Sequence, residues 1–148
     1  MAVIGGGYIG LEMGAVWRRL GAEVTVIEYL DRILPGMDGE VSKDMQRILK
    51  KQGMTFKLGT KVVEAKSSAK GVALKLESAN VGDQENLNVD VVLVAVGRKA
   101  YTDGLGLDKI GVKTDDRGRV EVDKKFKSSV DSIYAIGDVI AGPMLAHK

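Results

Sequence analysis

Cysteine is absent from this chain of 148 residues, and histidine occurs once, as His147. Without cysteine there is no disulfide, no thiolate nucleophile and no thiolate metal ligand, and one histidine cannot build a histidine metal cluster. We therefore expect no metal site and no catalytic residue of these kinds. Any redox chemistry has to use a bound cofactor.

Long apolar runs and an excess of one charge are also missing. No stretch approaches the roughly 20 apolar residues that span a bilayer, and 22 basic residues stand against 20 acidic ones, giving a net charge of +2. This balance predicts no nucleic-acid partner and no membrane partner. The 45% of hydrophobic residues can bury one ordinary core. No leader precedes the first strand, which starts directly after Met1, and we expect a piece of a larger protein.

Glycine is abundant, and its densest cluster carries the strongest signal. The segment Gly-Gly-Gly-Tyr-Ile-Gly-Leu-Glu at 5–12 lies between an apolar stub and a helical pattern that continues to Leu20. In a GxGxxG fingerprint, Gly5 allows the turn out of the strand, Gly7 lets the backbone approach a pyrophosphate, and Gly10 permits close packing of helix on strand. The helix N-terminus that follows favours phosphate charge.

A carboxylate at the expected distance strengthens this prediction. Residues 23–28 are typical of a second strand and end in Glu28, at the ~20-residue offset of a ribose-binding acid. Glu28 can accept hydrogen bonds from both adenine-ribose hydroxyls, whereas a 2′-phosphate would bring negative charge against it. The sequence therefore favours NAD over NADP. Arg32 is the only nearby candidate partner for a 2′-phosphate, and a surface-loop role also fits it.

The remaining pattern predicts an α/β fold with a Rossmann-like parallel sheet. A helix over 40–52 and a third strand over 54–58 complete a βαβαβ unit. Short alternating segments at 61–65, 72–77 and 87–89 predict an antiparallel β-meander that replaces the usual third helix. The continuous apolar run 90–96 predicts a central strand buried on both faces, ending at the carboxyl edge where ligands bind.

The end of the chain has a different character. After several glycine-containing loops come two strand-like segments, 119–122 and 132–136, without a helix to cover them. They predict part of a second, incomplete domain whose partner strands are absent. Gly97 and Asp138 each follow a strand-like run, where a ligand contact and an ordinary turn are both open.

Four segments together resemble the two-dinucleotide flavoprotein disulfide reductases. They are Val-Ile-Gly-Gly-Gly-Tyr-Ile-Gly-Leu-Glu at 3–12, Val-Ala-Val-Gly-Arg at 94–98, Ile-Tyr-Ala-Ile-Gly-Asp at 133–138, and Ala-Gly-Pro-Met-Leu-Ala-His-Lys at 141–148. The segment 141–148 is the most discriminating and resembles the dihydrolipoamide dehydrogenases in particular, and Leu-Pro-Gly-Met-Asp-Gly-Glu-Val-Ser-Lys at 34–43 resembles their bacterial and mitochondrial branch. The resemblance covers essentially the whole chain.

The resemblance implies an NAD-binding domain over 1–118 and an incomplete C-terminal part of an FAD-binding domain over 119–148. Residues 5–12 would contact the pyrophosphate and nicotinamide portion, Glu28 the adenosine ribose, and Val62 the adenine, with Gly97 near the nicotinamide. Asp138 would bind the FAD ribitol, and 144–147 would lie beneath the flavin. The cofactor-binding residues so implied are Gly5, Gly6, Gly7, Tyr8, Ile9, Gly10, Leu11, Glu12, Glu28, Val62, Gly97, Gly137, Asp138, Met144, Leu145, Ala146 and His147.

The implied parent enzyme oxidises protein-bound dihydrolipoamide and reduces NAD through FAD and a redox disulfide. It would be a homodimer that works with the lipoyl-bearing acyltransferase of 2-oxoacid dehydrogenase complexes. Its location would be a bacterial cytoplasm, or the mitochondrial matrix in a eukaryote. Because the redox cysteine pair is missing here, we predict no lipoamide turnover by this chain alone.

Two alternatives stay open, namely the NAD-binding domain of a sister flavoprotein disulfide reductase and a stand-alone NAD-binding module without catalysis. The orphan strand 132–136 is expected to be disordered, to fold back, or to pair with a second copy.

Overall fold

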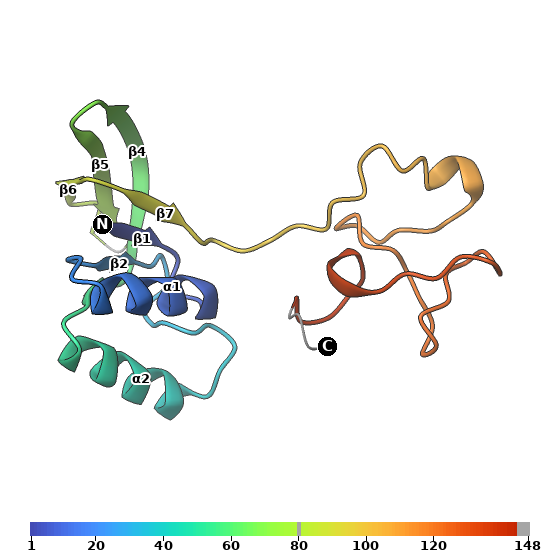
Figure 1. The fold of residues 1–148 in the computed structure, drawn as a ribbon, viewed down its shortest axis with the longest axis horizontal. Helices are drawn as coiled ribbons and strands as arrows, with labels where there is room; N and C mark the ends of the chain where they lie inside the picture. The colour runs from blue at the N-terminus through green and yellow to red at the C-terminus, as the bar shows by residue number, and fades with distance from the viewer. Residues whose placement is uncertain (80, 145–148) are drawn as a thin grey trace. The chain divides into compact units, whose positions relative to one another are not determined.

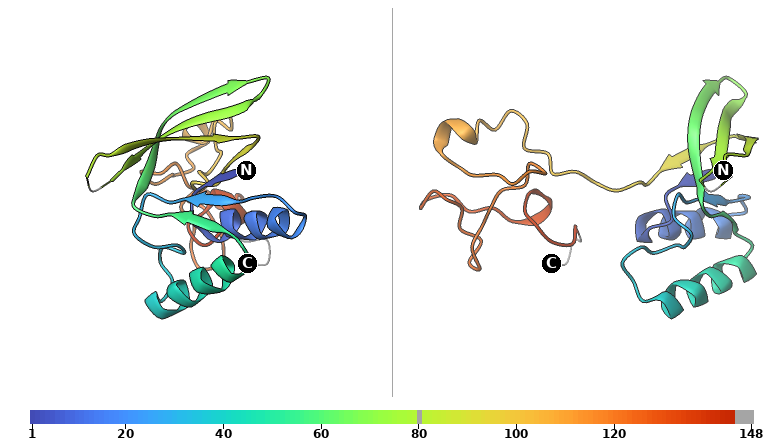
Figure 2. Two further views of the ribbon diagram at one scale, coloured as in Figure 1. Left: turned by 90° about the vertical axis from the view of Figure 1, so that its left-hand side faces the viewer. Right: turned by 180° about the vertical axis from the view of Figure 1, so that it is seen from behind.

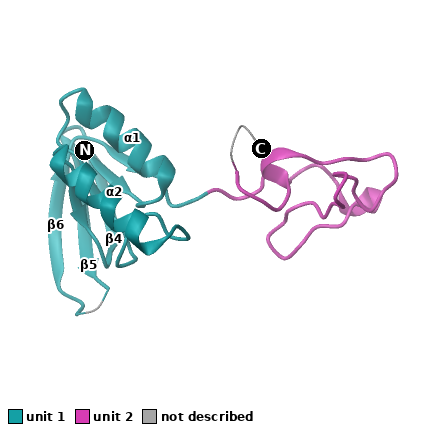
Figure 3. Ribbon diagram, turned by 90° about the horizontal axis from the view of Figure 1, so that it is seen from below, with its two compact units in different colours: residues 1–97 teal, residues 98–148 magenta. Residues whose placement is uncertain are grey.

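The computed structural model describes residues 1–79 and 81–144. It consists of two compact units, Met1–Gly97 and Arg98–Lys148 (Figure 3). The first unit holds all the helices and strands of more than three residues within the described part of the chain.

A four-stranded parallel sheet forms the centre of the first unit. Its strands β1 (Ala2–Ile4), β2 (Thr25–Ile27), β3 (Thr55–Lys57) and β7 (Val92–Val94) lie in the order β3-β2-β1-β7. Helix α1 (Tyr8–Arg19) connects β1 to β2, and helix α2 (Gly39–Lys51) connects β2 to β3. These bounds confirm the predicted βαβαβ unit to within two residues at each end.

The predicted antiparallel meander is also confirmed. Strands β4 (Thr60–Ser68), β5 (Gly71–Ser78) and β6 (Gln84–Val89) form a three-stranded sheet in which each strand pairs with the next. Both helices lie on one side of β1 and β2, with β4 and β5 on the other (Figure 1; Figure 2). The unit is therefore built of three layers.

Alternating side chains of the parallel strands join these layers. Val3 and Val26 are fully buried and pack toward the helices, in a cluster with Leu11 of α1 and Leu49 of α2. The next residues along each strand turn to the other face. Ala2 and Ile27 pack there against the meander residues Leu74 and Leu76. Apolar residues on both faces explain why these strands read as continuous hydrophobic runs.

The run 90–96 does contain a strand, β7, but the prediction that this strand is central and buried on both faces is wrong. Only Val92–Val94 forms a strand, and it lies at the edge of the sheet beside β1. Val91, Val94 and Val96 are 57–70% exposed. An apolar run reports a preference for burial on two faces, but the order of strands depends on long-range pairing that the run does not encode.

The strands predicted over 119–122 and 132–136 are also absent. Single bridges stand in their place, at Val120 and Tyr134, together with two short 3₁₀ turns, η1 (Asp108–Ile110) and η2 (Gly137–Val139). This second unit has a small core of its own around Val112, Val120 and Ile140. Residues 132–136 fold back onto neighbouring residues, yet Tyr134 and Ile136 are 61% and 71% exposed. Two short segments without long partner strands cannot extend a ladder.

Candidate functional site

The glycine turn after β1 is shaped by two close approaches of the backbone. Gly5 has φ +107°, and a Cβ there would collide with the carbonyl oxygen of Ala95 after β7. A Cβ on Gly10 would collide with the carbonyl oxygen of Gly5. The positive φ of Gly5 and the close approach at Gly10 bear out the turn role predicted for the first glycine and the packing role predicted for the third.

Gly7 differs from both because it faces open space. It is the N-cap of α1, with φ −76°, and no atom lies within 4 Å of the position its Cβ would take. Within residues 1–79 and 81–144, the N–H groups of Gly7, Tyr8 and Ile9 find no hydrogen-bond acceptor. A row of free N–H groups at the positive end of a helix is a site for an anion.

Glu28 lies one residue beyond β2, and its carboxylate reaches the glycine turn. The Gly6 N–H donates to Glu28 Oε2 at 2.6 Å, and the Leu30 N–H donates to Oε1 at 2.8 Å. The residue is only 8% exposed. Each carboxylate oxygen has a second acceptor position, so Glu28 can still accept two hydroxyl donors.

The cations on the strands next to Glu28 are already paired. Lys57 Nζ lies 2.8 Å from Glu85 Oε1, and Lys61 Nζ lies 2.6 Å from Glu77 Oε1. The hydrogen bond to Glu77, more than its charge, raises the pKa of Lys61, and the same bond lowers the pKa of Glu77.

Arg32 is exposed and forms no ion pair with the described residues. Its Nη1 atom lies 3.9 Å from the Cβ position of Gly39 at the start of α2.

The other predicted residues of this unit lie in different environments. Leu11 is 5% exposed and belongs to the core, while Glu12 on the same helix is exposed. Val62 is half-buried and packs against the cluster between the two sheets. Gly97 has φ +117° with nothing within 4 Å of its Cβ position. The residues gathered at the carboxyl edge of β1 are thus Gly5, Gly6, Gly7 and Glu28.

In the second unit, Asp138 has a partner that the sequence did not indicate. Its Oδ2 atom lies 2.8 Å from Arg98 Nη1, and the same guanidinium donates to the carbonyl oxygen of Met144. Gly137 begins η2 with φ +73°. The predicted residues Leu145, Ala146 and His147 lie outside the described residues.

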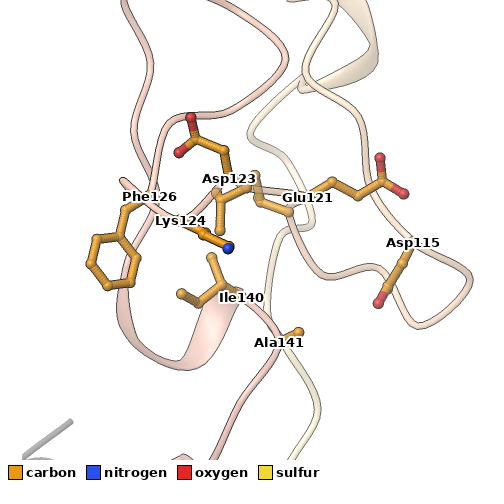
Figure 4. A pocket seen from close by; sticks show the side chains of 9 residues that line it. Asp115, Glu121, Asp123, Lys124, Phe126, Ile140 and Ala141 are labelled. Carbon is orange, nitrogen blue, oxygen red and sulfur yellow. The ribbon is translucent and has the colours of Figure 1, made fainter.

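A cavity of about 510 Å³ also lies in this unit (Figure 4). Its lining is Asp115, Val120, Glu121, Val122, Asp123, Lys124, Phe126, Ile140 and Ala141. None of the predicted site residues is among them. Arg119, by its side-chain hydrogen bond, holds the pKa of Asp115 below its usual value, so that this carboxylate already has its counter-charge.

Sequence reasoning missed one residue that contacts the glycine turn, Leu34. The N–H of Leu34 donates to the Gly6 carbonyl oxygen at 2.8 Å, and Leu34 has the left-handed φ of 52°. The Leu-Pro-Gly run predicted a loop, but no property of a leucine predicts that its backbone contacts a distant glycine.

No membrane-spanning helix and no cluster of metal-binding side chains occur in the described residues. The parallel sheet, its glycine turn, the open N-terminus of α1 and the buried carboxylate place the chain in the class of Rossmann-type α/β domains. The family model for pyridine nucleotide-disulphide oxidoreductases matches residues 1–148. The chain belongs to this family.

Named relatives agree with this assignment. The chain is 57% identical over 148 residues to the mitochondrial dihydrolipoyl dehydrogenase of Pisum sativum, covering all of this chain and 30% of that protein. It is 60% identical to leghemoglobin reductase of Vigna unguiculata, covering all of this chain and 28% of that protein. The chain spans about a third or less of the length of these relatives.

A solved structure shares the fold. The HOCl-induced flavoprotein disulfide reductase RclA from Escherichia coli superposes with a TM-score of 0.86 at 30% identity, covering 99% of this chain and 32% of that one. Relatives thus occur in a plant mitochondrion and in a bacterium.

Proposed function

We propose that the first unit binds NAD and that the chain is the NAD-binding portion of a dihydrolipoamide dehydrogenase. The observation that carries this proposal is Glu28, a buried carboxylate joined to the glycine turn by a 2.6 Å hydrogen bond. The relatives at 57–60% identity support the enzyme class.

The donors and acceptors that the turn leaves free support a position for the ligand. The pyrophosphate would lie against the N–H groups of Gly7, Tyr8 and Ile9, where Gly7 leaves open space. The adenine ribose would donate its hydroxyls to Glu28, and Val62 would contact the adenine. Tyr8, Ile9 and Glu12 would extend this surface toward the nicotinamide, with Gly97 on its other side.

Charge favours NAD over NADP. A 2′-phosphate would come against the Glu28 carboxylate, while Lys57 and Lys61 are already paired with glutamates. Like charges at close range in a partly buried site repel strongly. The exposed Arg32 is the remaining cation in the loop, and it has to compete with this repulsion.

FAD is the second candidate for the same turn, because the adenosine halves of both dinucleotides suit such a fingerprint. In the family, the FAD fingerprint belongs to the same half of the protein as a redox cysteine pair. This chain has no cysteine, which supports NAD at Gly5–Gly10 and an FAD site elsewhere in the longer protein.

We assign residues 1–118 to the NAD-binding domain and 119–148 to part of the FAD-binding domain. The compact units divide earlier, after Gly97. Asp138 would bind the ribitol of FAD, with Gly137, Met144, Leu145, Ala146 and His147 near the flavin. In this structure Asp138 is half-exposed and held by Arg98, which is compatible with an acceptor for ribitol hydroxyls.

The longer protein would oxidise dihydrolipoamide and pass the electrons through its disulfide and FAD to NAD. It would form homodimers and serve a lipoyl-bearing acyltransferase, in a bacterial cytoplasm or a mitochondrial matrix. The alternative is a sister reductase with another substrate, and the similarity to leghemoglobin reductase is consistent with this alternative. This chain alone would not turn over lipoamide.

Calorimetric titration of this chain with NADH, NADPH and FAD at one ionic strength tests the proposal. We expect NADH to bind, NADPH to bind at least about tenfold more weakly, and Glu28→Ala to weaken NADH by about tenfold or more. Glu23→Ala, an exposed glutamate of the preceding loop, is the control and should leave binding unchanged. Preferential binding of FAD, or NADH binding that ignores Glu28→Ala, would overturn it.

A further inference from the structure

The middle glycine of the turn is held from both sides. The Gly6 N–H donates to Glu28 Oε2 at 2.6 Å, and the Gly6 carbonyl oxygen accepts from the Leu34 N–H at 2.8 Å. Both partners come from the loop that connects β2 to α2. The N–H and the carbonyl oxygen of Gly6 therefore both form hydrogen bonds with residues of the segment 28–34 rather than with a ligand.

The same loop covers the side of Gly6. A Cβ on Gly6 would lie 3.2 Å from Glu28 Oε2 and 3.2 Å from Ile33 Cγ2, whereas nothing lies within 4 Å of the Cβ position of Gly7. Ile33 is fully buried and belongs to the core on the helix side of the sheet. The loop thus covers Gly6 and leaves the space beside Gly7 free.

Leu34 holds its position at a conformational cost. Its φ of 52° lies in the left-handed region that leucine rarely adopts. The residue is 9% exposed and packs in the same core as Ile33, and its carbonyl oxygen accepts from the Met37 N–H at 3.1 Å. Such a conformation persists only where surrounding contacts determine it, and it is typical of positions that serve a site.

We infer that Glu28 and Leu34 form a clasp on Gly6 that sets the turn before the dinucleotide arrives, with Leu34 as a positioning residue. This inference rests on the proposed dinucleotide binding. With Gly6 fixed, the N–H groups of Gly7, Tyr8 and Ile9 at the start of α1 have no acceptor among the described residues, and Gly7 leaves open space beside them. The ligand then meets a formed anion site, and less ordering is left to the binding step.

The clasp makes a distinct prediction for individual amides. In ¹⁵N-labelled protein without ligand, the amides of Gly6 and Leu34 should be protected from hydrogen exchange, and those of Gly7, Tyr8 and Ile9 should exchange freely. Adding NADH should shift the Gly7–Ile9 resonances and leave the Leu34 amide protected as before.

Two variants of Leu34 separate positioning from packing. Leu34→Gly and Leu34→Ala both remove the buried side chain, but only glycine adopts a positive φ without cost. We expect exchange protection of the Gly6 amide to fall about tenfold further in Leu34→Ala than in Leu34→Gly. NADH affinity should follow the same order. The amides of β2, measured in the same spectra, report whether each variant is folded.

The outcomes distinguish the two claims. Equal loss of protection and of NADH affinity in both variants would show that Leu34 acts by packing alone, and would overturn the clasp. Unprotected Gly6 and Leu34 amides in the free protein, with NADH still binding, would overturn it as well. If NADH shifts no amide of the folded protein, the proposed function fails first and the positioning role falls with it.

Discussion

Substituting Gly10 by alanine should destabilise the first unit, although alanine is the better helix former. A Cβ at Gly10 would lie closer than 3.0 Å to the Gly5 carbonyl oxygen, and 3.1 Å from Val3 Cγ1. Both neighbours are fixed, Gly5 by its own approach to Ala95 and Val3 by full burial in β1. Helix α1 must therefore move away from the sheet.

The movement is costly because α1 has few buried residues. Gly10, Leu11 and Gly14 are its buried positions, so a shift of the helix loosens most of its contact with the core. Overpacking of this kind costs about 1–3 kcal/mol, against a gain of up to about 1 kcal/mol in helix propensity. We expect a net loss of about 1–2 kcal/mol.

Trp17 supplies the assay. It is the single tryptophan, it lies on α1, and it is 45% exposed, so its fluorescence in a urea titration follows the unfolding of this unit alone. Gly7→Ala is the matched control, because that Cβ would meet no atom within 4 Å. This variant should change the free energy of unfolding by no more than about 0.5 kcal/mol, while weakening the binding of NADH. A Gly10→Ala midpoint at or above that of the wild type would refute the reasoning.

Three further predictions use other contacts. Glu28→Ala leaves two backbone N–H groups without an acceptor, and we expect a loss of about 2 kcal/mol in the Trp17 urea titration, against no loss for Glu23→Ala. Asp38→Ala removes the side-chain cap of α2, which should cost about 1 kcal/mol in the far-ultraviolet unfolding curve. Arg119 lowers the pKa of Asp115 from its ordinary 3.8. The stabilisation that the ionised Asp115 gives to the folded state is therefore complete above pH 3.8 and is lost as the pH falls through the lowered pKa. The amide resonances of residues 115–119 should report this loss, and Asp115→Asn should abolish the pH dependence.

Much of the first unit was predictable because its contacts are local or periodic. The order of strand, glycine turn, helix and strand predicted β1, α1, β2, α2 and β3, and short alternating segments predicted the meander. Glu28 was predictable from its spacing to the fingerprint, and it does contact the turn. The contact itself was not, since the sequence indicates a ribose acceptor but no bond to Gly6. The contact of Leu34 with Gly6 could not be predicted for a similar reason, because backbone atoms make this contact.

The exposed helix faces show the same limit from another side. Met13, Val16 and Trp17 of α1 are spaced as a buried stripe, yet they are 41–45% exposed. The core of the helix side uses Leu11 and the glycines instead, because glycine brings the helix backbone close to the sheet. Periodicity thus identifies an apolar face without identifying what covers it.

Two neighbouring hairpins of the second unit explain why its irregular parts resisted prediction. In 115–119 and 123–127, the first Asp accepts from two backbone N–H groups, and the fourth residue has a positive φ, +75° at Gly118 and +64° at Phe126. A glycine predicts this conformation and a phenylalanine predicts against it. Phe126 adopts it because the Asp123 carboxylate and the bond from the Ala135 N–H to its carbonyl determine the turn from both sides. Where pairing with a distant segment outweighs the local preference, as at Phe126 and at Leu34, only the structure reveals the conformation.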